Sequence, residues 1–246
     1  MFKKLLLLTI LVLTTISCQF TETLVLNEDG SGRMAIQMDL SEMMAFSGEM
    51  GTDSTMVKSD TIISFKDILE EKKDSIATLT KAEQKRLKAM ENYNIHLVTD
   101  PETNTMIMDI FVDFKDIAEA NDLMAGFNQA DGVMPGSKSN EDEGDKEKEP
   151  DIIGVKYSFK KGVFKRDAFI KDKMVHRQQI DSMKQAEAFL GEAKYTLKYT
   201  FPKKIKSASV EDAMFSLDGK TIEVRRSFME YLKNPDVLDL EVKLED

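Results

Sequence analysis

The chain has 246 residues, 41% of them hydrophobic, which is enough to bury a core in one large domain or two small ones. Its formal net charge is −10, and its densest basic stretch after the first twenty residues is FPKKIK at 201–206, which we interpret as a solvated turn. Nucleic acids attract basic patches, so this charge balance argues against a nucleic-acid-binding protein.

The first twenty residues, MFKKLLLLTILVLTTISCQF, have the layout of a secretory signal. Lys3 and Lys4 form a short positive region, and an apolar run at 5–16 follows. The run is shorter than the roughly 20 apolar residues of a membrane-spanning helix, but it suits a signal peptide. Ser17, a small residue, directly precedes Cys18, the single cysteine of the chain, where cleavage is expected.

The stretch TISC resembles the lipobox of bacterial lipoproteins, although Thr15 stands where that motif usually has leucine. The resemblance implies that residues 1–17 are a lipoprotein signal peptide and that Cys18 carries the acyl chains of a membrane anchor. An ordinary signal peptide with an incidental cysteine is the alternative. By analogy with lipoprotein sorting in Gram-negative bacteria, Gln19 after the cysteine implies an outer-membrane protein that faces the periplasm.

Residues 18–131 are predicted to form a first α+β half that begins with a hairpin. Leu24 and Leu26 alternate with polar residues, NEDGSG at 27–32 reverses the chain, and alternation resumes after it. A second hairpin is expected at 95–114, with its turn at 100–104. Between them we predict two helices, the first with Ser64 as N-cap and the second beginning after Thr80.

Residues 132–152 combine Gly, Pro and Ser with a dense run of mixed charges and no aromatic residue. Such a segment cannot bury enough surface to offset its ordering entropy, so we predict a disordered acidic linker or loop insertion.

Residues 153–246 are predicted to form a second α+β half, and the two halves form either separate domains or one continuous domain. Hairpins are expected to turn at Lys161-Gly162 and at Asp218-Gly219. Between them an amphipathic helix is predicted to bury Ile180 and Met183, and YTLKYTF alternates as a strand. The fold class that follows is α+β, with an antiparallel sheet built from several hairpins and amphipathic helices packed on one side.

Two segments resemble the framing strands of LppM-type bacterial lipoprotein domains. They are ETLVLNEDGSGRMAIQMDL near the start and YTLKYTFPKKIKSASVEDAMFSLDGKTIEVR near the end. Glu223 and Val224 depart from the pattern, because an aromatic residue is expected there. The resemblance implies a membrane-tethered α+β module of poorly defined function that binds lipids or envelope partners, and it implies no catalytic residues.

The sequence has few groups that could carry chemistry. Its two histidines, His96 in a predicted strand and His176 in a predicted helix, lack the closely spaced partners of a zinc site and are expected to be solitary surface or half-buried residues. No nucleotide-binding or serine-hydrolase motif occurs, so we predict no catalytic residues, no metal ligands and no cofactor. Methionine is frequent, with 16 residues, and Met34, Met38, Met106 and Met108 are expected to pack in the core.

These observations predict a membrane-anchored lipoprotein of the cell envelope that binds or assembles a protein or lipid partner and catalyses nothing. Two alternatives stay open. One is a carboxylate-based hydrolase, which would need two carboxyl groups converging in a cleft. The other is copper handling, which would need several methionine sulfurs at one exposed site.

Overall fold

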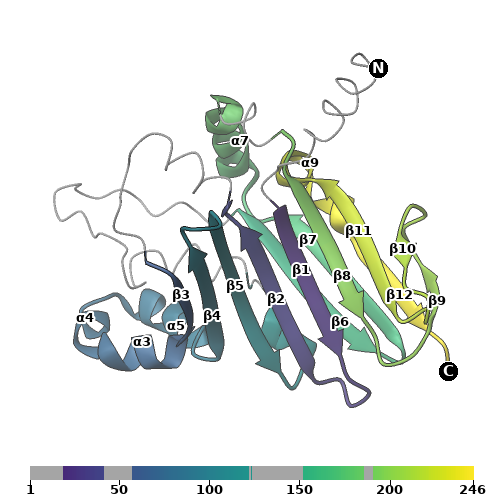
Figure 1. The fold of residues 1–246 in the computed structure, drawn as a ribbon, viewed down its shortest axis with the longest axis horizontal. Coiled ribbons are helices and arrows are strands. Elements are labelled where there is room, and N and C mark those ends of the chain that lie inside the picture. The colour runs from purple at the N-terminus through teal and green to yellow at the C-terminus, as the bar shows by residue number, and fades with distance from the viewer. Residues whose placement is uncertain (1–18, 42–56, 122, 124–151, 186–190) are drawn as a thin grey trace.

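The computed structural model describes residues 19–41, 57–121, 123, 152–185 and 191–246 (Figure 1). The predicted signal peptide at 1–17, Cys18 and residues 132–151 of the predicted linker lie outside these residues. The α+β class is confirmed, because strands in antiparallel hairpins alternate with short helices. None of the helices in the described ranges is long and apolar enough to cross a membrane.

The larger sheet has eight strands in the order β10-β11-β8-β1-β2-β5-β4-β3. In chain order these strands are β1 Gln19–Leu26, β2 Gly32–Asp39, β3 Ser59–Ser64, β4 Tyr93–Asp100, β5 Thr105–Phe114, β8 Lys194–Thr200, β10 Met214–Phe215 and β11 Thr221–Ser227. All neighbours are antiparallel except β1 and β8, which run parallel. Strands from both sides of the segment 132–152 therefore pair within one sheet, and the boundary proposed there stays a prediction.

The smaller sheet has four antiparallel strands in the order β6-β7-β12-β9. They are β6 Ile153–Lys160, β7 Val163–Ile170, β9 Ile205–Ala208 and β12 Leu240–Leu244. Figure 1 shows this sheet behind the larger one, so the two sheets form a sandwich. The basic stretch 201–206 only partly forms a turn, because Ile205 begins β9 while Lys203 and Lys204 are exposed.

The helices are short and lie around the margins of the sandwich. Their bounds are α3 Phe65–Glu71, α4 Lys73–Ala77, α5 Lys81–Ala89, α7 Lys173–Ser182 and α9 Phe228–Lys233, with 3-10 turns η1 Ile117–Ala120, η2 Met183–Gln185 and η3 Pro235–Leu238. In Figure 1, α3, α4 and α5 lie at the β3 edge, whereas α7 and α9 lie at the end where β1 begins. The smaller sheet packs against the inner face of the larger one at β1 and β8, whereas α3 packs against β3 and β4.

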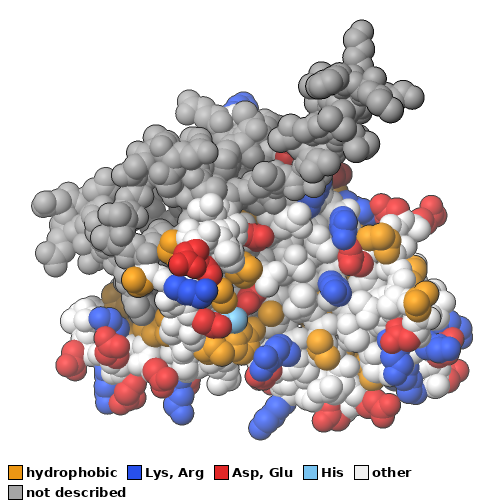
Figure 2. All heavy atoms as spheres, viewed as in Figure 1, with side chains coloured by type: hydrophobic (Ala, Val, Ile, Leu, Met, Phe, Trp, Pro, Cys, Tyr) orange, Lys and Arg blue, Asp and Glu red, His pale blue; other side chains and the backbone are white. Residues whose placement is uncertain are grey.

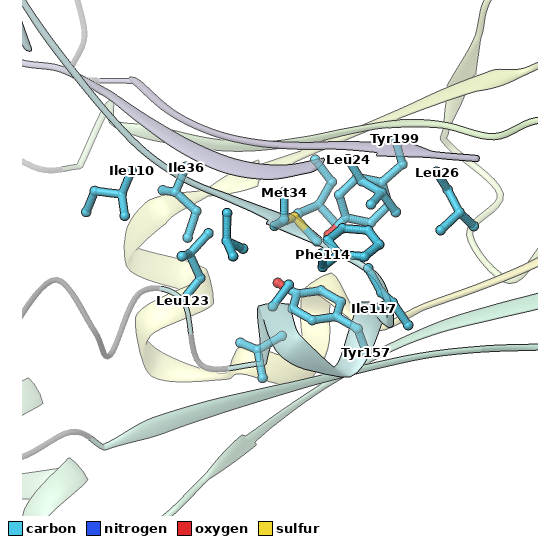
Figure 3. Close-up of a cluster of buried hydrophobic side chains, with 14 of the residues drawn as sticks. Leu24, Leu26, Met34, Ile36, Ile110, Phe114, Ile117, Leu123, Tyr157 and Tyr199 are labelled. Carbon is cyan, nitrogen blue, oxygen red and sulfur yellow. The ribbon is translucent and has the colours of Figure 1, made fainter. Parts of the chain in front are cut away.

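The core lies between the two sheets because alternate residues of each strand point toward the other sheet. Leu24, Met34 and Ile110 come from the larger sheet and Tyr157 from the smaller one, and Figure 3 shows them facing one another. Ile117 of η1 fills space between the layers (Figure 3). The predicted hydrophobic alternation is therefore the feature that builds this core.

Turn residues adopt the backbone conformations that the sequence predicts. Lys161 and Gly162 both have positive φ, 51° and 71°, as a tight hairpin turn between β6 and β7 requires. Gly219 has φ of 70° at the turn that follows β10. These positions fix which residues of each strand face the core.

Three local predictions around α7 and α3 need correction. Ile180 and Met183 are only half-buried, and the buried residue of α7 is His176. His176 therefore is not the surface or half-buried residue we expected, because its Nε2 lies 2.7 Å from the Leu232 carbonyl oxygen of α9. Ser64 precedes α3 as expected, but its side chain makes no capping hydrogen bond.

Candidate functional site

The outer face of the larger sheet carries a group of apolar residues over β3, β4 and β5. Ile62 is 64% exposed, and Val98, Ile107 and Phe111 are half-buried. Val98 and Ile107 are direct partners across β4 and β5, so their side chains stand side by side on this face. Figure 2 shows hydrophobic side chains gathered there beside a histidine. We call these four residues the outer patch.

His96 lies in the middle of the outer patch and bridges three strands. Its Nε2 is 2.8 Å from Asp60 Oδ1 on β3, and its Nδ1 is 3.3 Å from Asp109 Oδ2 on β5. In the strand register, His96 lies between Ile62 of β3 and Asp109 of β5. The polar side chains of His96 and Asp109 therefore lie among the apolar residues of the patch. The hydrogen bond with Asp60, supported by the Asp60 charge and by Asp109, raises the pKa of His96 above its usual value.

An arginine borders the outer patch on the β2 side. The Arg33 guanidinium binds Asp113 with two hydrogen bonds, Nε to Oδ1 at 2.6 Å and Nη2 to Oδ2 at 2.8 Å. Its Cζ also lies 4.6 Å from the centre of the Phe111 ring. The hydrogen bonds from Arg33 hold the pKa of Asp113 below its ordinary value. Phe111 and Arg33 thus lie on one side of the His96–Asp109 pair, and Val98 and Ile107 lie on the other side.

A second polar cluster, which sequence reasoning missed, lies inside the sandwich around Glu22. The hydroxyl of Tyr157 donates to Glu22 Oε1 at 2.6 Å, and the hydroxyl of Tyr199 donates to the same oxygen. The Arg166 guanidinium spans the carboxylate, with Nε 3.2 Å from Oε1 and Nη2 3.0 Å from Oε2. The hydroxyl of Tyr195 donates to Oε2 at 2.8 Å. We call these five residues the Glu22 cluster.

The Glu22 cluster connects the two sheets through side chains that are buried from solvent. Glu22 and Arg166 are 1% and 2% exposed, and they come from β1 of the larger sheet and β7 of the smaller one. Arg166 Nη1 donates to the Leu238 carbonyl oxygen at 3.1 Å, and its Cζ lies 5.7 Å from the Tyr231 ring centre. The charged pair therefore has hydrogen-bond partners beyond itself, as a buried pair needs.

Electrostatics keep the Glu22 cluster charged. Burial raises the pKa of Glu22, but the Arg166 charge and the hydrogen bonds from Arg166, Tyr157 and Tyr199 outweigh it, so the pKa lies below its usual value. Burial and the Glu22 charge raise the pKa of the Tyr199 hydroxyl, which stays protonated and donates. Every hydrogen bond to Glu22 is thus maintained at neutral pH.

The sequence did contain a signal for this cluster. Glu22 has the same alternation phase as Leu24 and Leu26, and Arg166 has the phase of Phe164 and Ala168, so both charged residues point inward with apolar neighbours. A charge in a core phase indicates a buried partner of opposite sign. Periodicity alone does not say which residue that partner is.

The other predicted site residues are placed as follows. Met34, Met38 and Met108 are buried in the core, and Met106 is half-buried, so these methionines form no exposed sulfur site. The remaining methionines of the crowded segment, Met43, Met44, Met50 and Met56, lie outside the described residues. Within the described ranges, no three His, Cys, Asp or Glu side chains are grouped so as to hold a metal ion.

Comparison with known proteins gives one distant structural neighbour. No family model matches the chain, and no curated protein matches it. Among solved structures, the chain is similar to the folded domain of the Mycobacterium tuberculosis LppM protein, determined by NMR. The match covers 95% of each chain, with a TM-score of 0.41 and 8% sequence identity. At this level the likeness carries no argument about a ligand, a partner or a site.

Proposed function

We propose that the protein is a lipid-anchored lipoprotein of the cell envelope, held in the outer membrane with its body in the periplasm, and that its outer patch binds a protein partner. The anchor part rests on the signal layout before Cys18 and on the lipobox resemblance. The binding part rests on one observation, the outer patch with its exposed Ile62 on the outer face of the larger sheet. A catalytic role has no comparable support.

The composition of the outer patch favours a protein over a small molecule. Contiguous exposed apolar groups on a polar surface mark interaction sites. Protein interfaces are enriched in aromatic residues and arginine, and here Phe111 and Arg33 stack at one border of the patch. The residues stand in rows on a sheet face, which offers a broad contact surface, whereas small ligands bind in concave sites.

The anchor is tested by metabolic labelling with a palmitate analogue. The wild-type chain is expected to take up the label, and Cys18→Ala is expected to lose it, because the thiol is the only one in the chain. Thr21→Ser, which leaves residues 1–17 and Cys18 unchanged, serves as the control for expression and export. Equal labelling of the wild type and Cys18→Ala would contradict the anchor.

The binding surface is tested with a photo-crosslinking amino acid placed at residue 62, at residue 107 or at residue 214. Met214 is 50% exposed and lies on β10, at the opposite edge of the larger sheet from β3, so it is a matched control. Crosslinking at 62 and 107 to the same protein, which disappears with Phe111→Lys, supports the proposal. Equal products from all three positions, or none from 62 and 107, contradict it.

A further inference from the structure

A groove with a basic rim and an apolar floor lies among α3, α4 and α5. Figure 1 shows these helices at the β3 edge of the larger sheet. The cavity has a volume of about 600 Å³ and is formed by α3, α4, α5 and the residues that follow α5. This volume is within the range of small-molecule sites, roughly 300–1,000 Å³. We call it the helical groove.

The floor of the helical groove is apolar. Leu69 from α3 and Ile76 from α4 are half-buried, and Leu87 from α5 is 5% exposed. Three aliphatic residues from three different helices therefore meet in one depression. An alkyl chain that covered them would remove apolar surface from water on both sides of the contact.

The rim of the helical groove is basic. Five lysines, Lys66, Lys73, Lys81, Lys85 and Lys88, line it together with only two acidic residues, Glu70 and Glu91, which gives a local formal charge of +3. The whole chain has a formal charge of −10, so this concentration of positive charge runs against the composition of the protein. Lysine stems also extend the apolar surface while their ammonium groups stay in water.

One end of the rim is already neutralised and the other is not. Lys88 Nζ lies 2.5 Å from Glu91 Oε2, and the charge of Lys66 acts on the same carboxylate. Lys73, Lys81 and Lys85 are exposed, and among the described residues no acidic group forms an ion pair with them. These three lysines are thus available to an external anion.

The helices around the groove are held in place without a ligand. Gln84 of α5 donates from Nε2 to the Leu79 carbonyl oxygen at 2.9 Å, which ties α5 to the turn after α4. Phe65 and Ile68 of α3, with Met90 after α5, are buried in the main core. A preformed site loses less entropy on binding than one that must be ordered.

We infer that the helical groove binds a small anionic amphiphile with one alkyl chain and a carboxylate or phosphate head group. The alkyl chain lies on Leu69, Ile76 and Leu87, and the anionic head pairs with Lys73, Lys81 and Lys85. Charge complementarity and the apolar floor together select this class, because a neutral lipid leaves the lysines unused and a short polar anion leaves the floor exposed. The inference does not depend on the protein partner or on the anchor.

The test uses the full chain, purified in a neutral maltoside detergent and examined by native mass spectrometry. Three probes share one palmitoyl chain: palmitate, 1-palmitoyl lysophosphatidate and 1-palmitoyl glycerol. We expect one bound molecule of at least one anionic probe, and at least about tenfold weaker binding of the neutral probe. The two anionic probes distinguish a carboxylate head from a phosphate head. Octanoate, with a shorter chain, is expected to bind more weakly than palmitate.

The matched variants carry the same change of charge in two places. Lys73→Glu/Lys81→Glu/Lys85→Glu reverses the rim and is expected to weaken anionic binding by at least about tenfold. Lys160→Glu/Lys203→Glu/Lys206→Glu changes three exposed lysines elsewhere and is expected to leave binding unchanged.

Equal binding of the neutral and anionic probes, or equal losses in both triple variants, overturns the inference. Absence of any adduct with the wild type overturns it as well, and then points to a protein segment as occupant. The comparison of probes uses the wild type alone, so it decides the question even where the rim variant does not fold.

Discussion

The Glu22 cluster and the His96 group bring the same chemistry into two different environments. In each, a nitrogen-bearing side chain on one strand is held by carboxylate oxygens at hydrogen-bond distance. Arg166 and Glu22 are 144 residues apart in the sequence, whereas the partners of His96 come from the strands directly before and after its own. Glu22 and Arg166 are almost completely buried, whereas the side chains of His96 and Asp60 are 30% and 75% exposed. The contribution of each group to the free energy of unfolding therefore depends on its exposure to solvent rather than on its number of contacts.

This difference gives the buried cluster a role in stability and leaves the exposed group available for binding or titration. Removing a partner inside the sandwich leaves a charge that water cannot reach, whereas removing one on the outer face leaves a charge that water solvates. The buried cluster can therefore change its contacts only if the two sheets separate. The exposed group is free to change its state, or its partner, without unfolding the protein.

The largest expected effect is that of Glu22→Gln. This variant leaves the Arg166 charge buried without its counter-charge, and breaking such a pair costs about 3–5 kcal/mol of unfolding free energy. Urea unfolding followed by circular dichroism measures the loss. An unfolding free energy within about 1 kcal/mol of the wild type would show that the buried pair contributes little. It would then contribute no more than the exposed pairs of the outer face.

The same variant has a pH signature. Because the folded pKa of Glu22 lies below its usual value, the stabilisation is present above the unfolded pKa of about 4.3 and is lost as the pH falls through the folded pKa. The stability gap between the wild type and Glu22→Gln is therefore expected to be wide at pH 7 and to narrow in strong acid. Unfolding curves from pH 7 to pH 3 measure this gap, and a gap that widens in acid contradicts the assignment.

A smaller loss is expected from Tyr199→Phe, which removes one donor to Glu22 and keeps the ring. A hydrogen bond to a charged group contributes about 1.5–3 kcal/mol. In the double variant with Glu22→Gln the two losses should not add, because both changes act on one hydrogen-bonded unit. Additive unfolding energies would show that Tyr199 acts independently of the carboxylate.

On the outer face, Asp113→Asn is expected to change stability by less than about 1 kcal/mol, although Arg33 binds Asp113 with two short hydrogen bonds. Both side chains are more than half exposed, so water and salt screen the pair. The same urea measurement, with 0.5 M salt as a further condition, gives the comparison. A loss of unfolding free energy as large as that of Glu22→Gln would show that the exposed and buried pairs contribute equally to stability.

The smallest effect concerns a titration rather than folding. The pKa of His96 is raised, chiefly by its hydrogen bond with Asp60, so Asp60→Asn should lower it toward the usual value of about 6.5. The stabilisation from the charged imidazole is complete below that value and disappears as the pH rises through the folded pKa. NMR titration of the two histidines measures the shift, and an unchanged His96 pKa in Asp60→Asn contradicts the role of Asp60.

Local patterns in the sequence predicted the hairpins well. Alternation in β1, β4 and β8, with positive-φ turns at Lys161-Gly162 and Gly219, is a short-range property that one strand and its turn determine together. The parallel pairing of β1 with β8 and the separation into two sheets could not be predicted, because they depend on contacts between residues about 170 positions apart.

The sites were predicted less completely than the fold. Glu22 and Arg166 were visible as charges in a core phase, but only the sandwich shows that they meet. The outer patch joins residues of three strands, none of which is unusual alone. Around α7, the pattern favoured Ile180 and Met183 as the buried residues, whereas the structure buries His176, whose Nε2 contacts the Leu232 carbonyl oxygen. Cys18 stays a prediction.

β1 starts at Gln19 and lies between β2 and β8 in the middle of the larger sheet. At about 3.3 Å per residue, an acylated Cys18 would leave almost no spacer between the bilayer and this strand. The body would then be unable to swivel freely, and the sheet end that carries α7 and α9 would face the lipid head groups. A pulling force on the acyl chains would act directly on β1. Because β1 is hydrogen-bonded to β2 and β8, the force would be distributed over the whole sheet.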